Sequence, residues 1–165
     1  MLVGVEQGIL LAIVLSLIDH TRRGYAPKNV VLVPGETGGW RPHPWGSKAQ
    51  AAPGLIIYHF THGMYYANAQ RLTEEIMHLA NTTNPPLRWL CIDASAVDDV
   101  DYSAAETIRS LHTVLKDKGI RLVIAHVLRD VEAESRYHML ELFGEEAFYD
   151  TVGEVVKDYQ SQERQ

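Results

Sequence analysis

The sequence has little of what proteins that bind nucleic acid or depend on disulfides require. Its 165 residues carry 15 lysines and arginines against 21 aspartates and glutamates, for a formal net charge of −6. A nucleic-acid binder gathers positive charge on one face, so nucleic acid is not an expected partner. The one cysteine, Cys91, excludes an intrachain disulfide. It lies in an apolar run, as expected of a core residue in a protein made for a reducing compartment.

Motifs that hold phosphates, metals or a catalytic nucleophile are also absent. The sequence has no Gly-x-x-x-x-Gly-Lys-Ser/Thr loop and no Gly-x-Gly-x-x-Gly turn, so no cofactor is expected and any nucleotide binding would have to be weak. The eight histidines include no His-x-x-x-His pair, and no Cys-x-x-Cys accompanies them, so no metal site is expected. The sequence also has no Gly-x-Ser-x-Gly elbow and no histidine base evident for Ser103, so nucleophilic catalysis is not expected.

Long hydrophobic runs are missing except near the N-terminus. Residues Ile9 to Ile18 are uncharged and apolar all round a helix, which does not suit a helix lying on a globular domain. About 20 apolar residues cross a bilayer, so we expect this run to be the final turns of a membrane helix. Arg22, Arg23 and Lys28 follow it, as positive charges do on the cytoplasmic side. Residues 1–29 are therefore predicted to be a helix end with its linker, and residues 30–165 a separate domain.

Strand-like and helix-like patterns alternate through residues 30–165. Apolar runs of strand length are Val30–Val33, Leu55–Phe60, Trp89–Ile92 and Leu122–Val127. Residues 34–54 have no hydrophobic period and are predicted to be a loop. Helical spacing begins after Asn68, Ser103 and Thr151, and more weakly over Asp130–Leu142. This alternation predicts an α/β fold, with a mostly parallel sheet of four or five strands layered with about four helices.

The most informative segment follows the predicted strand Trp89–Ile92, where carboxylates surround a serine. These carboxylates are Asp93, Asp98, Asp99, Asp101 and Glu106. Ser103 and Glu106 have the spacing of a capping box, as do Thr151 and Glu154, so Ser103 and Thr151 are predicted to cap the helices that follow them. The cap at Ser103 would contribute about 1 kcal/mol. The same hydroxyl is a candidate phosphoacceptor, because phosphate suits a helix N-terminus. The neighbouring carboxylates would oppose that phosphate.

Residues 63–70 join the predicted strand Leu55–Phe60 to its helix. Asn68 is able to cap this helix, and Tyr65 and Tyr66 stand at the junction. Two interpretations are open. The aromatic rings close the core over the end of the sheet, or Tyr66 and Asn68 belong to a surface that meets a ligand or partner.

Several segments, in order along the chain, carry a resemblance to a known family. They are the apolar stretch with its ending at Arg23 and Pro27, then Pro53–Phe60, Tyr66–Ala69, Asp93–Ser103 and Lys118–Leu122. Together they resemble the cytoplasmic STAS region of the SulP (sulfate permease) family of anion transporters, across essentially the whole chain. Tyr102 and Ala104 depart from the family's signature, in which small hydroxyl residues and glycine are common.

The resemblance implies a STAS-like fold and a non-catalytic regulatory and docking domain on the cytoplasmic side of the cell membrane. The implied partner is the transmembrane domain of the same transporter, with a regulatory protein or a second copy as further candidates. Ser103 falls at the position that is phosphorylated in related bacterial anti-sigma factor antagonists. The alternative is therefore a free-standing phospho-switch of that kind. The apolar run Ile9–Ile18 argues against it, because a cytosolic antagonist has no use for such a start.

Overall fold

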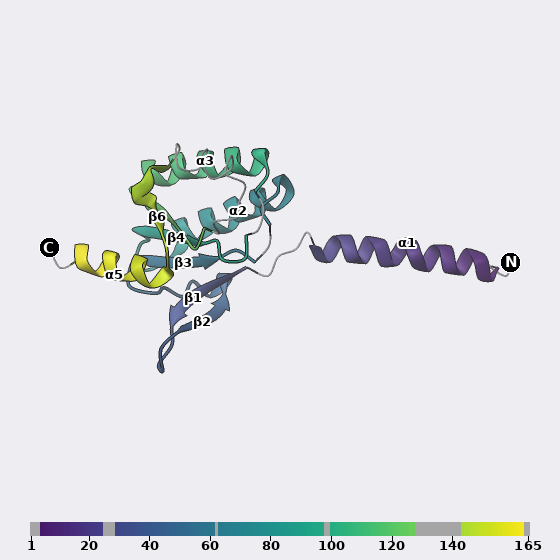
Figure 1. The fold of residues 1–165 in the computed structure, drawn as a ribbon, viewed down its shortest axis with the longest axis horizontal. Helices are drawn as coiled ribbons and strands as arrows, with labels where there is room; N and C mark the ends of the chain where they lie inside the picture. The colour runs from purple at the N-terminus through teal and green to yellow at the C-terminus, as the bar shows by residue number, and fades with distance from the viewer. Residues whose placement is uncertain (1–3, 25–28, 62, 98–99, 128–142, 164–165) are drawn as a thin grey trace.

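A six-stranded sheet with helices on both faces forms the body of the molecule (Figure 1). The computed structural model describes residues 4–24, 29–61, 63–97, 100–127 and 143–163. The strands are β1 (Val30–Pro34), β2 (Trp40–Pro44), β3 (Leu55–His59), β4 (Trp89–Asp93), β5 (Arg121–Ala125) and β6 (Phe148–Tyr149). The helices are α1 (Val5–Gly24), α2 (Tyr66–Thr82), α3 (Tyr102–Asp117) and α5 (Val152–Gln162). The helix predicted over Asp130–Leu142 lies outside the described residues.

The strands follow the order β2-β1-β3-β4-β5-β6. Strands β3 to β6 are parallel to one another, whereas β1 is antiparallel to both of its neighbours. The predicted α/β architecture with a mostly parallel sheet is therefore confirmed. The sheet has six strands where four or five were predicted.

The two strands that the patterns missed are β2 and β6. The sequence of β2 contains two prolines and no apolar alternation, and Pro42 and Pro44 pair with Leu32 and Val30 of β1. This is an edge strand, where residues without an N–H group are tolerated. The prediction that residues 34–54 form only a loop is therefore wrong. Strand β6 has two residues, which is too short to show a period.

Alternate residues of the central strands pack into two separate cores. One core faces α2 and α3 and includes Ile56, Tyr58, Leu90, Ile92, Leu122 and Ile124. The other faces α5 and includes Leu55, Ile57, Trp89, Cys91 and Val123. A parallel sheet covered on both faces needs apolar side chains at nearly every strand position. Burial raises the pKa of the Cys91 thiol, which agrees with its predicted place in the core.

Helix α5 begins at the residue that the sequence indicated. The Thr151 hydroxyl accepts a hydrogen bond from the Glu154 N–H at 3.2 Å, so the predicted cap is confirmed. The Glu154 carboxylate accepts from the Asp150 N–H instead of closing the box on Thr151.

One row of paired residues runs across β1, β3, β4 and β5 at one end of the sheet. The first strand, β1, begins in this row. Val30 pairs with His59, His59 with Asp93, and Asp93 with Ala125. The row lies at the carboxyl ends of β3, β4 and β5, and at the start of the antiparallel β1. Helix α1 extends from this side of the body, and α2 and α3 begin on it (Figure 1). We call this side of the domain the carboxyl edge.

Helix α1 stands clear of the body in Figure 1. Its large apolar side chains between Ile9 and Ile18 are 47–64% exposed, and neither core described above includes them. Within the described ranges, the structure has no helix of the length and apolar character needed to cross a bilayer. The division between residues 1–29 and 30–165 stays a prediction.

Candidate functional site

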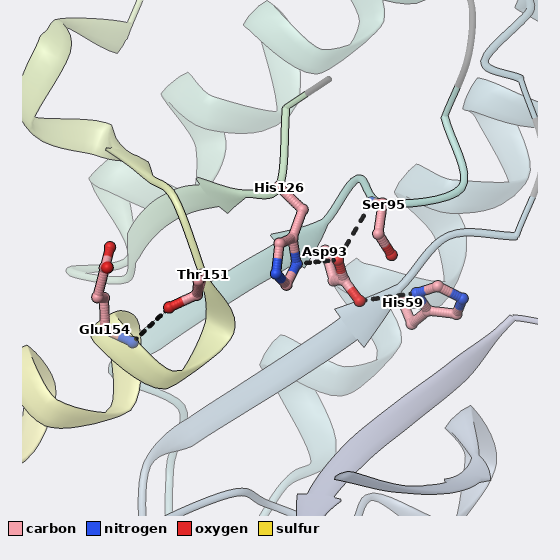
Figure 2. Close-up of polar contacts among 6 residues, drawn as sticks. All are labelled: His59, Asp93, Ser95, His126, Thr151 and Glu154. Carbon is pink, nitrogen blue, oxygen red and sulfur yellow. Dashed lines mark hydrogen bonds and ion pairs between the residues drawn. The ribbon is translucent and has the colours of Figure 1, made fainter. Parts of the chain in front are cut away.

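Asp93, at the end of β4, is bonded to two histidines from the neighbouring strands (Figure 2). Its Oδ2 lies 2.8 Å from Nδ1 of His59, the last residue of β3, and its Oδ1 lies 2.9 Å from Nδ1 of His126, just after β5. The Ser95 N–H donates to Oδ1 at 3.1 Å. The Asp93 side chain is 5% exposed, against 23% for His59 and 36% for His126. Parallel strands thus bring together three residues that are distant in sequence.

The hydrogen bonds determine the charge of Asp93 and which nitrogen of each histidine ring carries a hydrogen. Burial raises the pKa of Asp93, but hydrogen bonds from His59, His126 and Ser95 outweigh it and lower the pKa to about 2. An ionised carboxylate only accepts hydrogen bonds, so both rings carry a hydrogen on Nδ1. The remaining ring nitrogens point away from each other (Figure 2). They are therefore two separate polar groups and do not converge on one ligand.

His126 is held over Asp93 by an uncommon backbone conformation. Its φ is 58°, in the left-handed region that few non-glycine residues adopt. Its backbone N–H donates to the Tyr149 carbonyl at 3.2 Å. The end of β5 is thus bent so that the ring reaches the carboxylate.

Acid is expected to weaken the domain through Asp93. The pKa of this carboxyl is about 2 in the folded protein against 3.8 for an aspartate exposed to solvent, so its contribution to stability is present above pH 4 and is lost between about pH 4 and 2. Its expected size, after allowance for partial solvent screening, is about 1–2 kcal/mol. Urea unfolding from pH 6 to pH 2 should show Asp93→Asn less stable than the parent at pH 6, with the difference shrinking in that window. The exposed control Asp117→Asn should follow the parent, and parallel curves for parent and Asp93→Asn would contradict the assignment.

Asp101 caps α3 and also ties it to α2. Its Oδ1 accepts from the Ala104 N–H at 2.6 Å, and its Oδ2 accepts from the Tyr66 N–H, the first residue of α2, at 3.0 Å. The Asp101 N–H donates to the Met64 carbonyl at 2.9 Å. A carboxylate is stabilised by the positive end of a helix dipole. Here one carboxylate serves two helices and holds their first turns together.

The prediction that Ser103 is the N-cap is wrong, because Asp101 occupies that position and Ser103 is the second residue of α3. Aspartate and serine are both good caps. Asp101 differs from Ser103 in that its carboxylate also accepts a hydrogen bond from the Tyr66 N–H of α2. Glu106 forms an ion pair with Arg109 at 3.6 Å. Ser103 is exposed, as a phosphoacceptor must be. Its phosphorylation stays a prediction.

Asp101→Ala is expected to lower the free energy of unfolding by about 1.5–2 kcal/mol, at the high end for a cap because two helix amides lose their acceptor. Ser103→Ala is expected to change it by less than about 0.5 kcal/mol, as an exposed substitution that breaks no cap. Chemical unfolding of the two variants measures both values. The opposite order would restore Ser103 as the cap.

The remaining predicted site residues have different outcomes. Asp98 and Asp99 lie outside the described residues. Tyr66 is 64% exposed, so the interpretation that it closes the core is wrong. Asn68 is 4% exposed: its Oδ1 accepts from the Tyr65 N–H and its Nδ2 donates to the Gly63 carbonyl, both at 2.8 Å. The prediction that Asn68 lies on a partner surface is therefore wrong, because its side chain fixes the start of α2 from inside.

Sequence reasoning missed a buried polar cluster around Glu75. This residue is 4% exposed and accepts from Asn29 Nδ2 at 3.1 Å, from Arg71 Nε at 2.9 Å and from the Tyr58 hydroxyl. Burial, together with the neighbouring Glu75, raises the pKa of Tyr58 and keeps its hydroxyl a donor. Asn29 directly precedes β1, so the cluster anchors the chain where it enters the sheet. The signal was a glutamate between Leu72 and Leu79 on the apolar face of α2.

Residues 47–155 match the family model described as the STAS domain. The chain belongs to the STAS domain family. The resemblance noted in the sequence is thereby confirmed at the level of the domain, and the match includes Asp93, Asp101 and Ser103.

Sulfate transporters are among the proteins similar to this STAS chain. A probable sulfate transporter of Mycobacterium tuberculosis (strain H37Rv) is 27% identical over 159 residues, which are 94% of this chain and 28% of that protein. High affinity sulfate transporter 2 of Stylosanthes hamata is 27% identical over 169 residues, covering 94% of this chain and 25% of that protein. The chain spans about a quarter of the length of these curated relatives.

Two solved structures illustrate the likeness of fold. The murine Slc26a9 anion transporter in its inward-facing state has a TM-score of 0.74 at 14% identity, covering 93% of this chain and 25% of that chain. A Thermotoga maritima protein assigned as an anti-sigma factor antagonist has a TM-score of 0.54 at 15% identity, covering 65% of this chain and 88% of that chain. At these identities the STAS fold is what is shared.

Proposed function

We propose that this chain is the non-catalytic regulatory and docking domain of a SulP-type anion transporter, and that α1 joins it to the transporter's own transmembrane domain. One observation carries the proposal. The STAS family model begins at residue 47, but the alignment with a sulfate transporter covers 94% of the chain. The uncovered 6% of 165 residues is about 10 residues, fewer than the 46 that precede residue 47. The likeness to a transporter therefore extends into the N-terminal part that the STAS domain proper does not include.

The exposure of α1 supports the same proposal. Contiguous apolar surface of this kind is unfavourable in water and marks a contact with another protein or a membrane. Membrane helices that precede α1 in a transporter would cover it. The basic residues Arg22, Arg23 and Lys28 that follow the apolar run fit the cytoplasmic side of a membrane. The domain would then lie on the cytoplasmic side of the cell membrane.

Transport by the full-length protein tests this function. Reconstituted in vesicles, the protein should take up labelled sulfate or another inorganic anion. A truncation after Gly24, which retains α1 and removes the STAS body, should lose most of that uptake while inserting in equal amount. Equal insertion, measured by alkaline extraction, separates lost regulation from lost assembly. Undiminished uptake after the truncation would contradict a regulatory role.

A second candidate is the free-standing phospho-switch related to anti-sigma factor antagonists. The exposed Ser103 in the first turn of α3 favours it, together with the shared fold. The Asp101 carboxylate already accepts from the helix amide that a phosphate would use, which disfavours it. Mass spectrometry of the protein from its native cells tests this candidate. A soluble protein phosphorylated at Ser103 would support the switch, whereas an unmodified membrane protein would exclude it.

A further inference from the structure

We infer that the carboxyl edge, with the exposed rings of Tyr66 and Tyr102, is the face of the STAS body that contacts basic cytoplasmic loops of the membrane domain. This inference rests on the proposed function and deepens it. It assigns the docking face and the chemistry of the partner.

The length of the tether limits which face can meet the membrane domain. Helix α1 ends at Gly24, and Asn29 is buried and bonded to Glu75 at 3.1 Å. Five residue steps span at most about 18 Å when fully extended. The end of α1 at Gly24 therefore lies within about 18 Å of Asn29, which adjoins the row of Val30 and His59. The far end of the sheet, where α5 ends, is on the opposite side of the body (Figure 1).

Two tyrosines give this edge a surface suited to a protein contact. Tyr66 opens α2 and Tyr102 opens α3, and they are 64% and 76% exposed. Among the described residues, neither ring has a hydrogen bond or ring contact, so the STAS body itself does not use them. Asp101 fixes the backbone at both tyrosines, because it precedes Tyr102 and accepts from the Tyr66 N–H at 3.0 Å. Tyrosines combine a large apolar ring with a polar hydroxyl and are enriched at interface centres.

Charge favours cytoplasmic loops of the membrane domain over the lipid surface as the partner of the carboxyl edge. The edge carries the ionised Asp93 together with Asp101, and the chain has a net charge of −6. Arg22, Arg23 and Lys28, which precede this edge, suit anionic headgroups, whereas the carboxylates of the edge itself are repelled by them. Cytoplasmic loops of membrane proteins carry an excess of lysine and arginine, and arginine stacks on tyrosine rings.

Site-specific photo-crosslinking in the full-length protein in its membrane tests the inference. A benzophenone amino acid replaces Tyr66 or Tyr102, and a matched control replaces Val114, which is 41% exposed near the other end of α3. Positions 66 and 102 should crosslink to cytoplasmic loops of the membrane domain, and position 114 should not. Tyr102→Ala should lower the crosslinking from position 66 about tenfold, the loss expected when a tyrosine at the centre of an interface is truncated and contributes about 1.4 kcal/mol.

Three results would overturn the inference: crosslinks from 66 and 102 to lipid alone, crosslinks to a second copy of the STAS body alone, or equal crosslinking from 114. Alkaline extraction of the same membranes separates this failure from failure of the proposed function. A protein that is washed off the membrane overturns both. An inserted protein whose tyrosine positions crosslink elsewhere overturns only the docking face.

Discussion

Replacing Glu75 with alanine is expected to lower the free energy of unfolding by about 3–5 kcal/mol, the largest loss that we predict for a single substitution. Removing the carboxylate leaves the Tyr58 hydroxyl and the Asn29 amide buried without an acceptor, and Arg71 without its partner. Breaking a buried, bonded charge typically costs this much, because the groups left behind stay desolvated. Urea unfolding followed by circular dichroism measures the loss.

The neighbouring residue provides the matched control. Glu74 is exposed on the same turn of α2, so Glu74→Ala should change stability by less than about 0.5 kcal/mol. Glu75→Gln keeps an acceptor of the same shape and should fall between the two. If the alanine variants of residues 74 and 75 were equally stable, the buried cluster would not be an anchor.

Gly54→Ala is expected to lower the free energy of unfolding by about 2–4 kcal/mol, through backbone strain and a steric clash together. Gly54 has a φ of +86°, and an added Cβ would lie 2.5 Å from the Tyr159 hydroxyl oxygen. That hydroxyl donates to the Pro53 carbonyl at 2.6 Å and so attaches α5 to the turn before β3. The Tyr159 hydroxyl cannot move away from an added Cβ without losing its hydrogen bond to Pro53. Thermal and urea unfolding of the variant measure the effect.

Gly119 separates the two contributions. Its φ is +74°, but an added Cβ would meet nothing within 4 Å. Gly119→Ala should therefore show only the backbone penalty of about 1–2 kcal/mol. A loss at Gly54 no greater than the loss at Gly119 would show that Tyr159 moves away freely, against the packing described.

The fold was predictable where burial is strongest. Strands β3, β4 and β5 are buried on both faces, so their sequences are continuous apolar runs that need no context to be recognised. Strand β2 was not predictable in this way. Its residues Trp40 to Pro44 are stabilised by pairing with β1 at the edge of the sheet, and neither hydrophobic period nor strand propensity records such pairing.

The site was predictable only in part, because its contacts depend on register. Asp93 was identified as part of a carboxylate-rich segment, but its partners His59 and His126 are 34 and 33 residues away. Their meeting requires that β3, β4 and β5 end in the same row, which no local pattern fixes. The choice of Asp101 over Ser103 as the cap has a similar cause. The deciding bond comes from the Tyr66 amide of a different helix.

Alkaline extraction of the intact protein from its native membranes tests most directly whether α1 joins this STAS body to a membrane domain. The expected result is that the protein stays in the membrane pellet, with α1 protected from added protease and the STAS body digested from the cytoplasmic side. A protein released entirely into the supernatant, with α1 intact and accessible to protease, would contradict the assignment.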